Sequence, residues 1–362
     1  MGVNRLVFFR ADGNAQIASG HLVRCTSIAN ACRELGMEVR FLVSDKESEY
    51  LIQKKLCADF PVIRLESAVY NQLEKELPEL LALLEKVKNQ NTIFFLDSYF
   101  VNENYLTQIK AYTKVVYLDD LRLFDYPVDL LINYGVISAS SIPSYRDAYR
   151  NAGRLFLGAE YAPLRSQFLN KKIPVREKVS NILITTGGSD PCHFCVNLIE
   201  KLCKMGFWDK AASLGITIRL LVGYMNSDKA SLASFAEKLP ALKLYENIVD
   251  MASFMEKCDF AISAAGTTLF ELCALGLPAI SYTMADNQLY IANAFASENI
   301  IPYAGDIRTD LKQVLELVCQ FLTEMTEEKN DTYSKRKSAH ETMRRFIDGS
   351  GSVKIAEAVF SL

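Results

Sequence analysis

Short, mainly apolar runs recur along this chain of 362 residues, and helical patterns alternate with them. The runs cover residues 6–9, 39–43, 61–63, 92–96, 115–118 and 130–132, and then 181–185, 216–222, 242–245, 260–263 and 277–281. Apolar runs of this length are typical of parallel strands that are buried on both faces. These predicted strands alternate with helical patterns, the longest of which in the first half covers residues 70–88. The alternation predicts an α/β protein.

The length of the chain exceeds what one ordinary hydrophobic core supports, so we expect two domains. After Leu157 the sequence loses its buried-strand pattern, turns basic and contains Pro174, which is typical of a linker. We predict one domain over residues 1–172, a second over 173–345, and a C-terminal helix over 346–362. The Glu and Lys runs of the last fifty residues are expected on solvated helix faces.

The composition excludes several classes of function. The net charge of −3 provides no excess of positive charge for nucleic acid or for an anionic membrane. No apolar run approaches the roughly 20 residues that span a bilayer, and the first ten residues lack the layout of a signal peptide. We expect a cytoplasmic protein without a nucleic-acid partner and without stable membrane association. Nine cysteines in mostly apolar segments indicate buried thiols in a reducing compartment.

One cysteine spacing raises the question of a metal. Pro191-Cys192-His193-Phe194-Cys195 matches half of a zinc deaminase signature, but the other half, H-x-E, is missing upstream. A second cysteine pair is missing as well. We therefore predict no metal site and interpret Cys192, Cys195 and Cys203 as the packing face of a helix.

The stretch from Arg10 to Cys25 follows the first predicted strand and leads through a loop of small residues to a helix that starts near Gly20. In open α/β sheets ligands bind at such loops, and a helix start offers free N–H groups to an anion. His21 lies at this position. The alternative is that His21 only caps or packs the helix start, but the loop favours a functional histidine.

Polar groups also end three further predicted strands, at residues 97–99, 119–120 and 133. At one sheet edge these groups form a rim that can hold a ligand, although the ordinary polarity of loops is an alternative explanation.

Two motifs of the second half suit a nucleotide. Gly187-Gly188 follows a strand and allows a close approach of the backbone to a ligand. In residues 260–271 a strand ends at Ser263, a small loop follows, and hydroxyls stand where a helix begins, which suits a diphosphate. Glu271, one turn later, can accept hydrogen bonds from the hydroxyls of a ribose. Alternatively, Thr268 is an N-cap and Glu271 its capping-box partner, which leaves the small loop unexplained.

As a set and in this order, the motifs resemble a known family. They are RADGNAQIASGHLVRC, DSY at Asp97, LDD at Leu118, LGAEYAPLR at Leu157, TTGGSD at Thr185, ISAAGTTLFE at Ile262 and DNQ at Asp286. The family is the UDP-2,4-diacetamido-2,4,6-trideoxy-β-L-altropyranose hydrolases of pseudaminic acid biosynthesis. It is similar in fold to the GT-B glycosyltransferases, especially the one that adds N-acetylglucosamine to the lipid-linked peptidoglycan precursor. The resemblance implies two Rossmann-like domains, an active site in the cleft between them, and a final helix that crosses back onto the first domain.

The resemblance also implies roles for individual residues. His21 is the implied catalytic base, and the reaction is cleavage of the sugar C1–O bond by water, with inversion and without a metal or other cofactor. The implied UDP-binding residues are Gly187, Gly188, Ile248, Ser263, Gly266, Thr267, Thr268 and Glu271. The implied sugar-binding residues are Asp12, Gly20, Arg24, Tyr99, Arg165, Asn287 and Gln288. The charged segment 311–345 is long for the family, which leaves the exact sugar and the oligomeric state open, with a monomer favoured.

Two alternatives remain. A GT-B glycosyltransferase shares the UDP site but uses an acceptor hydroxyl in place of water. A relative with a lipid acceptor is expected to show an apolar patch with a basic rim in the first domain, and the sequence shows none. The other alternative is a non-catalytic UDP-sugar-binding protein, against which His21 argues.

Overall fold

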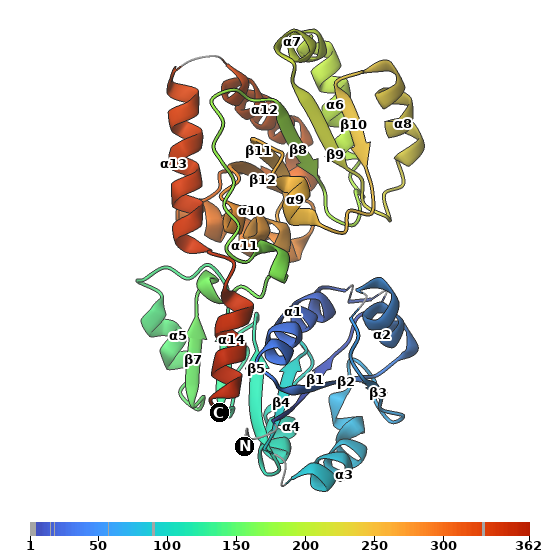
Figure 1. Cartoon of the computed structure of the whole chain (residues 1–362), viewed down its shortest axis with the longest axis vertical. Coiled ribbons are helices and arrows are strands. Elements are labelled where there is room, and N and C mark those ends of the chain that lie inside the picture. Colours follow the sequence, from blue (N-terminus) through green and yellow to red (C-terminus); the bar gives the residue numbers. More distant parts are fainter. Residues whose placement is uncertain (1–4, 15, 18, 57, 89–90, 328–329) are drawn as a thin grey trace. The chain divides into compact units, whose positions relative to one another are not determined.

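The computed structural model of the chain describes residues 5–14, 16–17, 19–56, 58–88, 91–327 and 330–362. They form two compact units. Unit 1 contains the described residues up to Ser166 together with Ser350–Leu362, and unit 2 is Gln167–Gly349. The divisions lie at 166/167 and 349/350, whereas the boundaries predicted from the sequence are 172/173 and 345/346. Each unit is built around one parallel sheet with helices on its faces (Figure 1).

The sheet of unit 1 has seven strands in the order β3-β2-β1-β4-β5-β6-β7, and all neighbours are parallel. Its strands are β1 (Leu6–Ala11), β2 (Glu38–Val43), β3 (Val62–Arg64), β4 (Thr92–Asp97), β5 (Lys114–Leu118), β6 (Leu130–Asn133) and β7 (Arg154–Leu157). The order runs outward in one direction from β1 and in the other from β4. Ligands of doubly wound sheets bind at the carboxyl ends of the strands at such a reversal.

Helices cover both faces of this sheet. They are α1 (Gly20–Glu34), α2 (Lys46–Tyr50), the π-helix η1 (Leu51–Lys55), the 3-10 helix η2 (Leu73–Glu76), α3 (Leu77–Val87), α4 (Glu103–Lys110), α5 (Ile142–Ala148), the 3-10 helix η3 (Ala159–Tyr161) and α14 (Gly351–Phe360). Leu80 of α3 and Leu106 of α4 share a buried cluster with Phe8 and Phe94 of the sheet. Helix α14, the last of the chain, packs beside α1 (Figure 1).

Close backbone contacts hold α14 in unit 1. A Cβ built at Gly351 would lie 2.2 Å from the carbonyl oxygen of Ala162, so only glycine fits there. One residue later, the Ser352 hydroxyl donates a hydrogen bond of 2.7 Å to the carbonyl of Leu164. The last helix is therefore an integral part of the first unit.

The sheet of unit 2 has six strands in the order β10-β9-β8-β11-β12-β13, again all parallel. The strands are β8 (Asn181–Thr185), β9 (Thr217–Leu221), β10 (Leu242–Tyr245), β11 (Phe260–Ala264), β12 (Ala279–Thr283) and β13 (Tyr303–Asp306). Its order reverses between β8 and β11, as that of unit 1 reverses between β1 and β4. Both units are thus Rossmann-like.

The helices of unit 2 are α6 (Phe194–Lys204), α7 (Phe207–Leu214), α8 (Lys229–Lys238), α9 (Met251–Met255), α10 (Thr267–Leu275), α11 (Asp286–Ser297), α12 (Ile307–Thr326) and α13 (Asn330–Phe346). A further 3-10 helix, η4 (Ser166–Phe168), lies where the chain passes from unit 1 to unit 2. Residues of α6, α7 and α12 share one buried cluster with the sheet, whereas α10 packs against α9 and α13.

Two predicted elements differ in extent from those of the structure, and two strands were missed. The helix expected over 70–88 is the 3-10 helix η2 followed by α3, which has Pro78 in its first turn, where proline is tolerated. The strand expected over 277–281 is β12, which starts only after Pro278. Strands β7 and β13 were missed, because they are only partly buried and lack a continuous apolar run.

Two predictions about burial also need correction. Cys195 is buried on α6, but Cys192 precedes the helix and is only partly buried against the core, and Cys203 is exposed and so lies outside the packing face. Cys57 lies outside the described residues. The charged segment is not only a solvated face, since Arg336 of α13 is 1% exposed. Its Nη2 donates hydrogen bonds of 2.8 Å to the carbonyl oxygens of Arg176 and Glu177, which ties α13 to the segment before β8.

Within the described ranges, no helix combines the length and the apolar character needed to cross a membrane.

Candidate functional site

In unit 1 the reversal of strand order brings the ends of β1 and β4 together. The loop after β1 leads into α1, which carries His21 and Arg24, and β4 ends in Asp97. Asp97 is 76 positions from His21 and 73 from Arg24, yet the side chains touch because β1 and β4 are neighbours in the sheet. All three are buried, with 8% exposure or less.

His21 does not cap the helix start. Its Nδ1 lies 2.6 Å from Oδ1 of Asp97, and its ring meets the ring of Tyr99 edge-on, with the centroids 4.5 Å apart. His21 is buried and packs against Tyr99, and its polar partner is the distant Asp97 rather than a backbone group of the helix start, so the capping alternative is wrong.

Arg24 binds two carboxylates at once. It donates from Nε and Nη2 to the two oxygens of Asp97, at 2.5 and 2.6 Å, and from Nη1 to Asp120 at 2.8 Å. The same Nη1 lies 2.6 Å from the hydroxyl of Tyr134. A guanidinium held in this forked way has a fixed position and orientation.

The contacts close into a circuit. The Tyr99 hydroxyl donates to Oδ2 of Asp120 at 3.1 Å, which completes a path from His21 through Asp97, Arg24, Asp120 and Tyr99 back to His21. We call these five residues and Tyr134 the His21 cluster. The sequence identified His21, Arg24 and Tyr99 individually, but Asp97 and Asp120 only as part of a polar rim, and it missed Tyr134.

Electrostatics favours an ionised Asp97. Burial alone would raise the pKa of this carboxyl, but the charges of Arg24 and His21 and their hydrogen bonds hold the pKa below its ordinary range. Burial and the nearby charge of Asp120 raise the pKa of Tyr99, so its hydroxyl stays protonated near neutral pH. The cluster therefore carries a fixed negative charge directly beside the imidazole.

Asp12 lies in a second, buried network. Its Oδ2 accepts from Arg10 at 2.6 Å and its Oδ1 from the amide of Ser44 at 2.7 Å. Arg10 in turn donates twice to Glu76, at 2.8 Å each. Both carboxylate oxygens of Asp12 thus have partners inside the protein, and the network fixes the end of β1 from which the loop to His21 departs.

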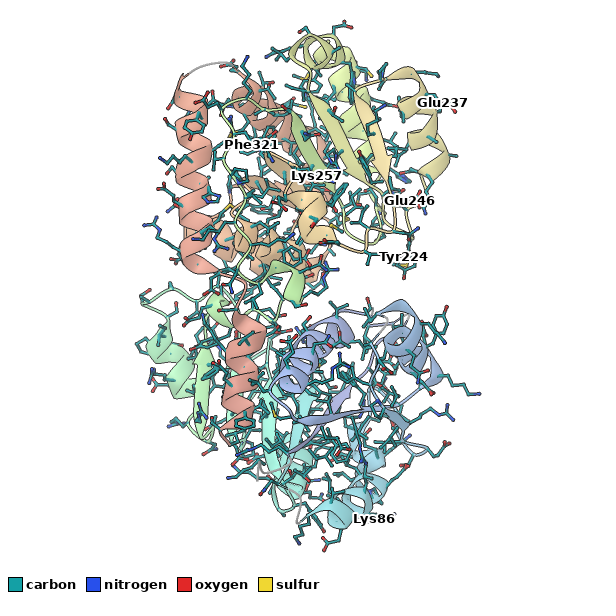
Figure 2. All side chains as sticks on the ribbon, in the orientation of Figure 1. Lys86, Tyr224, Glu237, Glu246, Lys257 and Phe321 are labelled. Atoms are coloured by element: carbon teal, nitrogen blue, oxygen red, sulfur yellow. The ribbon has the colours of Figure 1, made fainter. Side chains whose placement is uncertain are left out.

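In unit 2 the corresponding reversal brings together the loops after β8 and β11. Gly187 has a positive φ of 80°, and Gly223, after β9, packs on the same loop. A Cβ built at Gly223 would lie 2.4 Å from backbone atoms of Gly187 and Gly188. Figure 2 shows Tyr224 and Glu246 at this edge, on the loops after β9 and β10, and Tyr224 is 72% exposed.

The loop after β11 leads directly into α10. Ser263 is fully buried and its hydroxyl donates to the carbonyl of Ala264. Gly266 is the N-cap of α10, so Thr267 and Thr268 are its first two residues. The capping box from Thr268 to Glu271 is therefore wrong as an explanation, and Gly266 has no side chain to satisfy the first N–H groups of the helix. Such a helix start suits an anion.

The remaining predicted residues are distributed over both units. Ile248 is half-buried in the loop after β10, and Asn287 is exposed in the first turn of α11. Gln288 accepts a hydrogen bond of 2.8 Å from the amide of Met284 and so fixes that turn. In unit 1, Gly20 is the first residue of α1 with open space beside it, and Arg165 is half-buried between η3 and η4.

A cavity of about 620 Å³ in unit 2 lies elsewhere. It is lined by residues such as Val179, Leu214, Ile216 and Arg336, near the starts of β8 and β9 rather than near their carboxyl ends. Among the residues that the structure describes, no group of three or more His, Cys, Asp or Glu side chains is placed to hold a metal ion.

Comparison with known protein families gives one match. Residues 182–347, which lie within unit 2, match the Glycosyltransferase family 28 C-terminal domain.

Three relatives share sequence with the chain at low identity. An uncharacterized protein, MJ1062 of Methanocaldococcus jannaschii, is 28% identical over 283 residues, which are 74% of this chain and 54% of that protein. The spore coat polysaccharide biosynthesis protein SpsG of Bacillus subtilis is 24% identical over 95% of both chains. The UDP-2,4-diacetamido-2,4,6-trideoxy-beta-L-altropyranose hydrolase of Campylobacter jejuni is 22% identical over 74% of this chain and 88% of its own. The chain thus spans about half the length of the first of these relatives.

Solved structures of glycosyltransferases have the same fold. MurG of Acinetobacter baumannii aligns with a TM-score of 0.66 at 13% identity, over 99% of this chain and all of that one. The pneumococcal O-GlcNAc transferase GtfA, solved with UDP and GlcNAc, aligns with a TM-score of 0.62 at 10% identity, over 99% of both chains. These likenesses confirm the predicted class of two Rossmann-like units in a GT-B-like fold. The chain resembles the UDP-2,4-diacetamido-2,4,6-trideoxy-β-L-altropyranose hydrolases, as its motifs indicate, and its second unit resembles the C-terminal domain of glycosyltransferase family 28.

Proposed function

We propose that the chain is a hydrolase that releases UDP and a free sugar from a UDP-linked 2,4-diacetamido-2,4,6-trideoxy hexose in pseudaminic acid biosynthesis. The name of the Campylobacter jejuni relative and the order of the motifs support the substrate class. The observation that carries the proposal is His21. It is the only histidine of unit 1, and it stands buried at the reversal of the sheet with a carboxylate on its Nδ1. Of the ordinary side chains, histidine is the one whose pKa suits proton transfer near neutral pH.

In the proposed reaction a water molecule attacks C1 of the sugar from the face opposite UDP. The new C1–O bond forms as the old one breaks, and its electron pair stays on the diphosphate oxygen. His21 takes the proton of the attacking water. The configuration at C1 is inverted. On the sugar side we propose four residues of unit 1, namely Arg24, Tyr99, Gly20 and Arg165. Asp12 contributes there indirectly, because its buried network positions the loop before α1.

We propose that unit 2 binds UDP. The start of α10, with Gly266, Thr267 and Thr268, receives the diphosphate, because free N–H groups, hydroxyls and the helix dipole all favour an anion. Glu271 receives the ribose hydroxyls, and Gly187, Gly188, Ser263 and Ile248 shape the pocket. Asn287 and Gln288 are proposed to face the sugar. The same donors stabilise the charge that develops on the leaving UDP, so we propose turnover without a metal.

A glycosyltransferase is the second candidate, because solved glycosyltransferases share the fold. A transferase uses the hydroxyl of an acceptor as the nucleophile, where the hydrolase uses water. A non-catalytic UDP-sugar-binding protein is the third candidate.

The decisive experiment incubates the protein with a panel of UDP-sugars and no acceptor, and follows the release of UDP. We expect release from the diacetamido-trideoxy substrate, an inverted anomer in the proton NMR spectrum of the fresh product, and equal rates with and without EDTA. Release that requires an added acceptor would identify a transferase. Tight binding without release would identify a binding protein, and loss of activity in EDTA that Mg²⁺ restores would refute metal-independent turnover.

A further inference from the structure

We propose that Asp97 is the positioning residue of the site: it holds the proton of His21 on Nδ1 and thereby leaves Nε2 as the nitrogen that takes the proton of water. This inference rests on the proposed function for its kinetic consequence. Its structural part, the tautomer of His21, stands independently of any reaction.

The hydrogen bond between His21 and Asp97 determines where the imidazole carries its proton. Nδ1 of His21 and Oδ1 of Asp97 are 2.6 Å apart, and both side chains are at least 94% buried. Nη2 of Arg24 also lies 3.1 Å from Nδ1, but its shorter contact, at 2.6 Å, is with Oδ1 of Asp97. An ionised carboxylate only accepts hydrogen bonds, so the hydrogen between Nδ1 and Oδ1 belongs to Nδ1. In a neutral imidazole with Nδ1–H, the free lone pair is on Nε2.

Arg24 keeps Asp97 ionised and immobile. It donates to both oxygens of Asp97, so the carboxylate cannot turn away from the histidine without breaking a buried, charged hydrogen bond. Asp120 and Tyr134 bind the far end of the guanidinium and fix it in turn.

An amide cannot replace the carboxylate of Asp97. An asparagine at position 97 offers one acceptor oxygen to a site where three N–H donors now meet two oxygens. Oδ1 accepts from both Nδ1 of His21 and Nη2 of Arg24, and Oδ2 accepts from Nε of Arg24, so an amide NH₂ group meets a donor in either position. The guanidinium cannot become an acceptor, whereas the imidazole can. The amide NH₂ group is then left facing Nδ1 of His21, which must give up its hydrogen and become an acceptor. The proton moves to Nε2, and the histidine can no longer act as base toward water.

The test uses the small number of histidines. The chain has three, at positions 21, 193 and 340, so protein labelled with ¹⁵N-histidine gives three imidazoles, each assigned by its own substitution to asparagine. At about pH 8, where an ordinary histidine is neutral, we expect His21 of the wild type to show Nδ1 protonated and Nε2 bare. In Asp97→Asn the pattern should reverse, while the other two histidines keep theirs.

The kinetic arm measures the same variant with the substrate of the proposed reaction. We expect kcat of Asp97→Asn to fall about 10²- to 10⁴-fold, the range for losing a base, with KM and UDP affinity nearly unchanged.

Asp119→Asn is the matched control. Asp119 is also a buried carboxylate at this sheet edge, but its hydrogen bonds hold Tyr126, Tyr149 and the loop at 121–122 rather than His21. It should lower the unfolding temperature and leave the His21 tautomer unchanged. An unaltered tautomer in Asp97→Asn, or a reversal in Asp119→Asn as well, would overturn the proposal. If the wild type releases no UDP from any sugar, the proposed function fails, but the tautomer measurement still decides the role of Asp97.

Discussion

Arg10 and Glu76 form a two-pronged ion pair in the interior of unit 1, with Nε and Nη2 of the arginine each 2.8 Å from a carboxylate oxygen and both side chains fully buried. The Tyr105 hydroxyl adds a third hydrogen bond to Glu76 at 2.6 Å. Removing one partner of a buried pair leaves the other charge uncompensated. The free energy lost in this way is larger than the net stabilisation that the intact pair provides.

We therefore expect Glu76→Ala to destabilise unit 1 by about 3 to 5 kcal/mol. Hydrogen exchange measured by mass spectrometry would follow peptides of unit 1, which has no tryptophan. The fluorescence of Trp208, the only tryptophan of the chain, reports unit 2 and should change little. Glu74→Ala, an exposed neighbour in the same 3-10 helix, should leave exchange unchanged. Equal protection in Glu76→Ala and Glu74→Ala would contradict the role of the pair.

The proposed base gives a second prediction. His21→Asn should lower kcat about 10²- to 10⁴-fold, because asparagine has a similar size but cannot take a proton. UDP affinity, measured by calorimetry, should stay the same, since the proposed UDP residues belong to unit 2. His340→Asn, which alters a histidine of α13 that bonds to the carbonyl of Gly276, serves as the control for a general effect of losing an imidazole. Near-normal turnover of His21→Asn would remove the histidine from the mechanism.

A third prediction concerns the proposed ribose contact. Glu271→Ala should weaken UDP binding by about 1 to 3 kcal/mol, the cost of leaving charge-assisted hydrogen bonds unmade. Glu237 on α8 is an exposed carboxylate of the same unit, and Figure 2 shows it pointing outward. Glu237→Ala should bind UDP like the wild type in the same calorimetric titration. Equal affinities for all three proteins would exclude Glu271 from the site.

The contact of Gly223 with the loop after β8 gives a fourth prediction. A methyl group at position 223 would lie within 2.4 Å of Gly187 and Gly188, so the loop must move. We expect Gly223→Ala to weaken UDP binding and to cost about 1 to 3 kcal/mol of stability, as overpacking does.

Gly215→Ala is the control that separates the effect of Gly223→Ala on UDP binding from its effect on stability. Gly215 has a positive φ of 68° but no neighbour within 4 Å of a built Cβ, so alanine there should reduce stability without changing UDP affinity. If Gly223→Ala bound UDP normally, the loop would not belong to the binding site.

A fifth prediction follows from His193, whose Nδ1 lies 2.8 Å from Asp228. The hydrogen bond and charge of Asp228 raise the pKa of His193 above its ordinary value near 6.5. The folded protein thus binds this proton more tightly than the unfolded chain does. The resulting stabilisation is complete below about pH 6.5 and is lost as the pH rises through the higher, folded-state pKa.

Thermal unfolding followed by Trp208 fluorescence would measure this effect. The difference in Tm between wild type and His193→Gln should be larger at about pH 5.5 than at about pH 8.5. Asp228→Asn should abolish the same difference. A Tm gap that stays constant or grows with pH would contradict the assigned direction.

Much of the fold was predictable because buried parallel strands produce continuous apolar runs. Runs such as 92–96 and 260–263 therefore located β4 and β11 within a residue. Strands β7 and β13 lie at or near the edges of their sheets, where partial burial removes that signal. The helix starts at His21 and Thr267 were also predictable from the sequence. In both places a cluster of glycine and other small residues separates a strand pattern from a helical one.

The pairing of side chains across the sheet was not predictable. Arg10 and Glu76 are 66 positions apart, and Arg24 and Asp120 are 96 apart. Whether such residues meet depends on the order of the strands, which no periodicity of a single sequence encodes. Arg336 is a similar case, since it stands in a charged helix whose sequence looks solvated while its hydrogen bonds go to carbonyl groups before β8.

The return of α14 to unit 1 has a consequence for biosynthesis. The chain enters and leaves unit 2 at adjacent points, because a Cβ at Gly349 would lie 2.5 Å from the carbonyl oxygen of Phe168. Unit 2 is thus an insertion that emerges from the ribosome as one uninterrupted piece and has all its strands and helices before α14 is made. Unit 1 starts before unit 2 but is completed after it, since α14, which packs beside α1, follows all of unit 2. A ribosome that stops after α13 therefore releases a finished unit 2 and an α1, with His21 on it, that lacks its neighbouring helix.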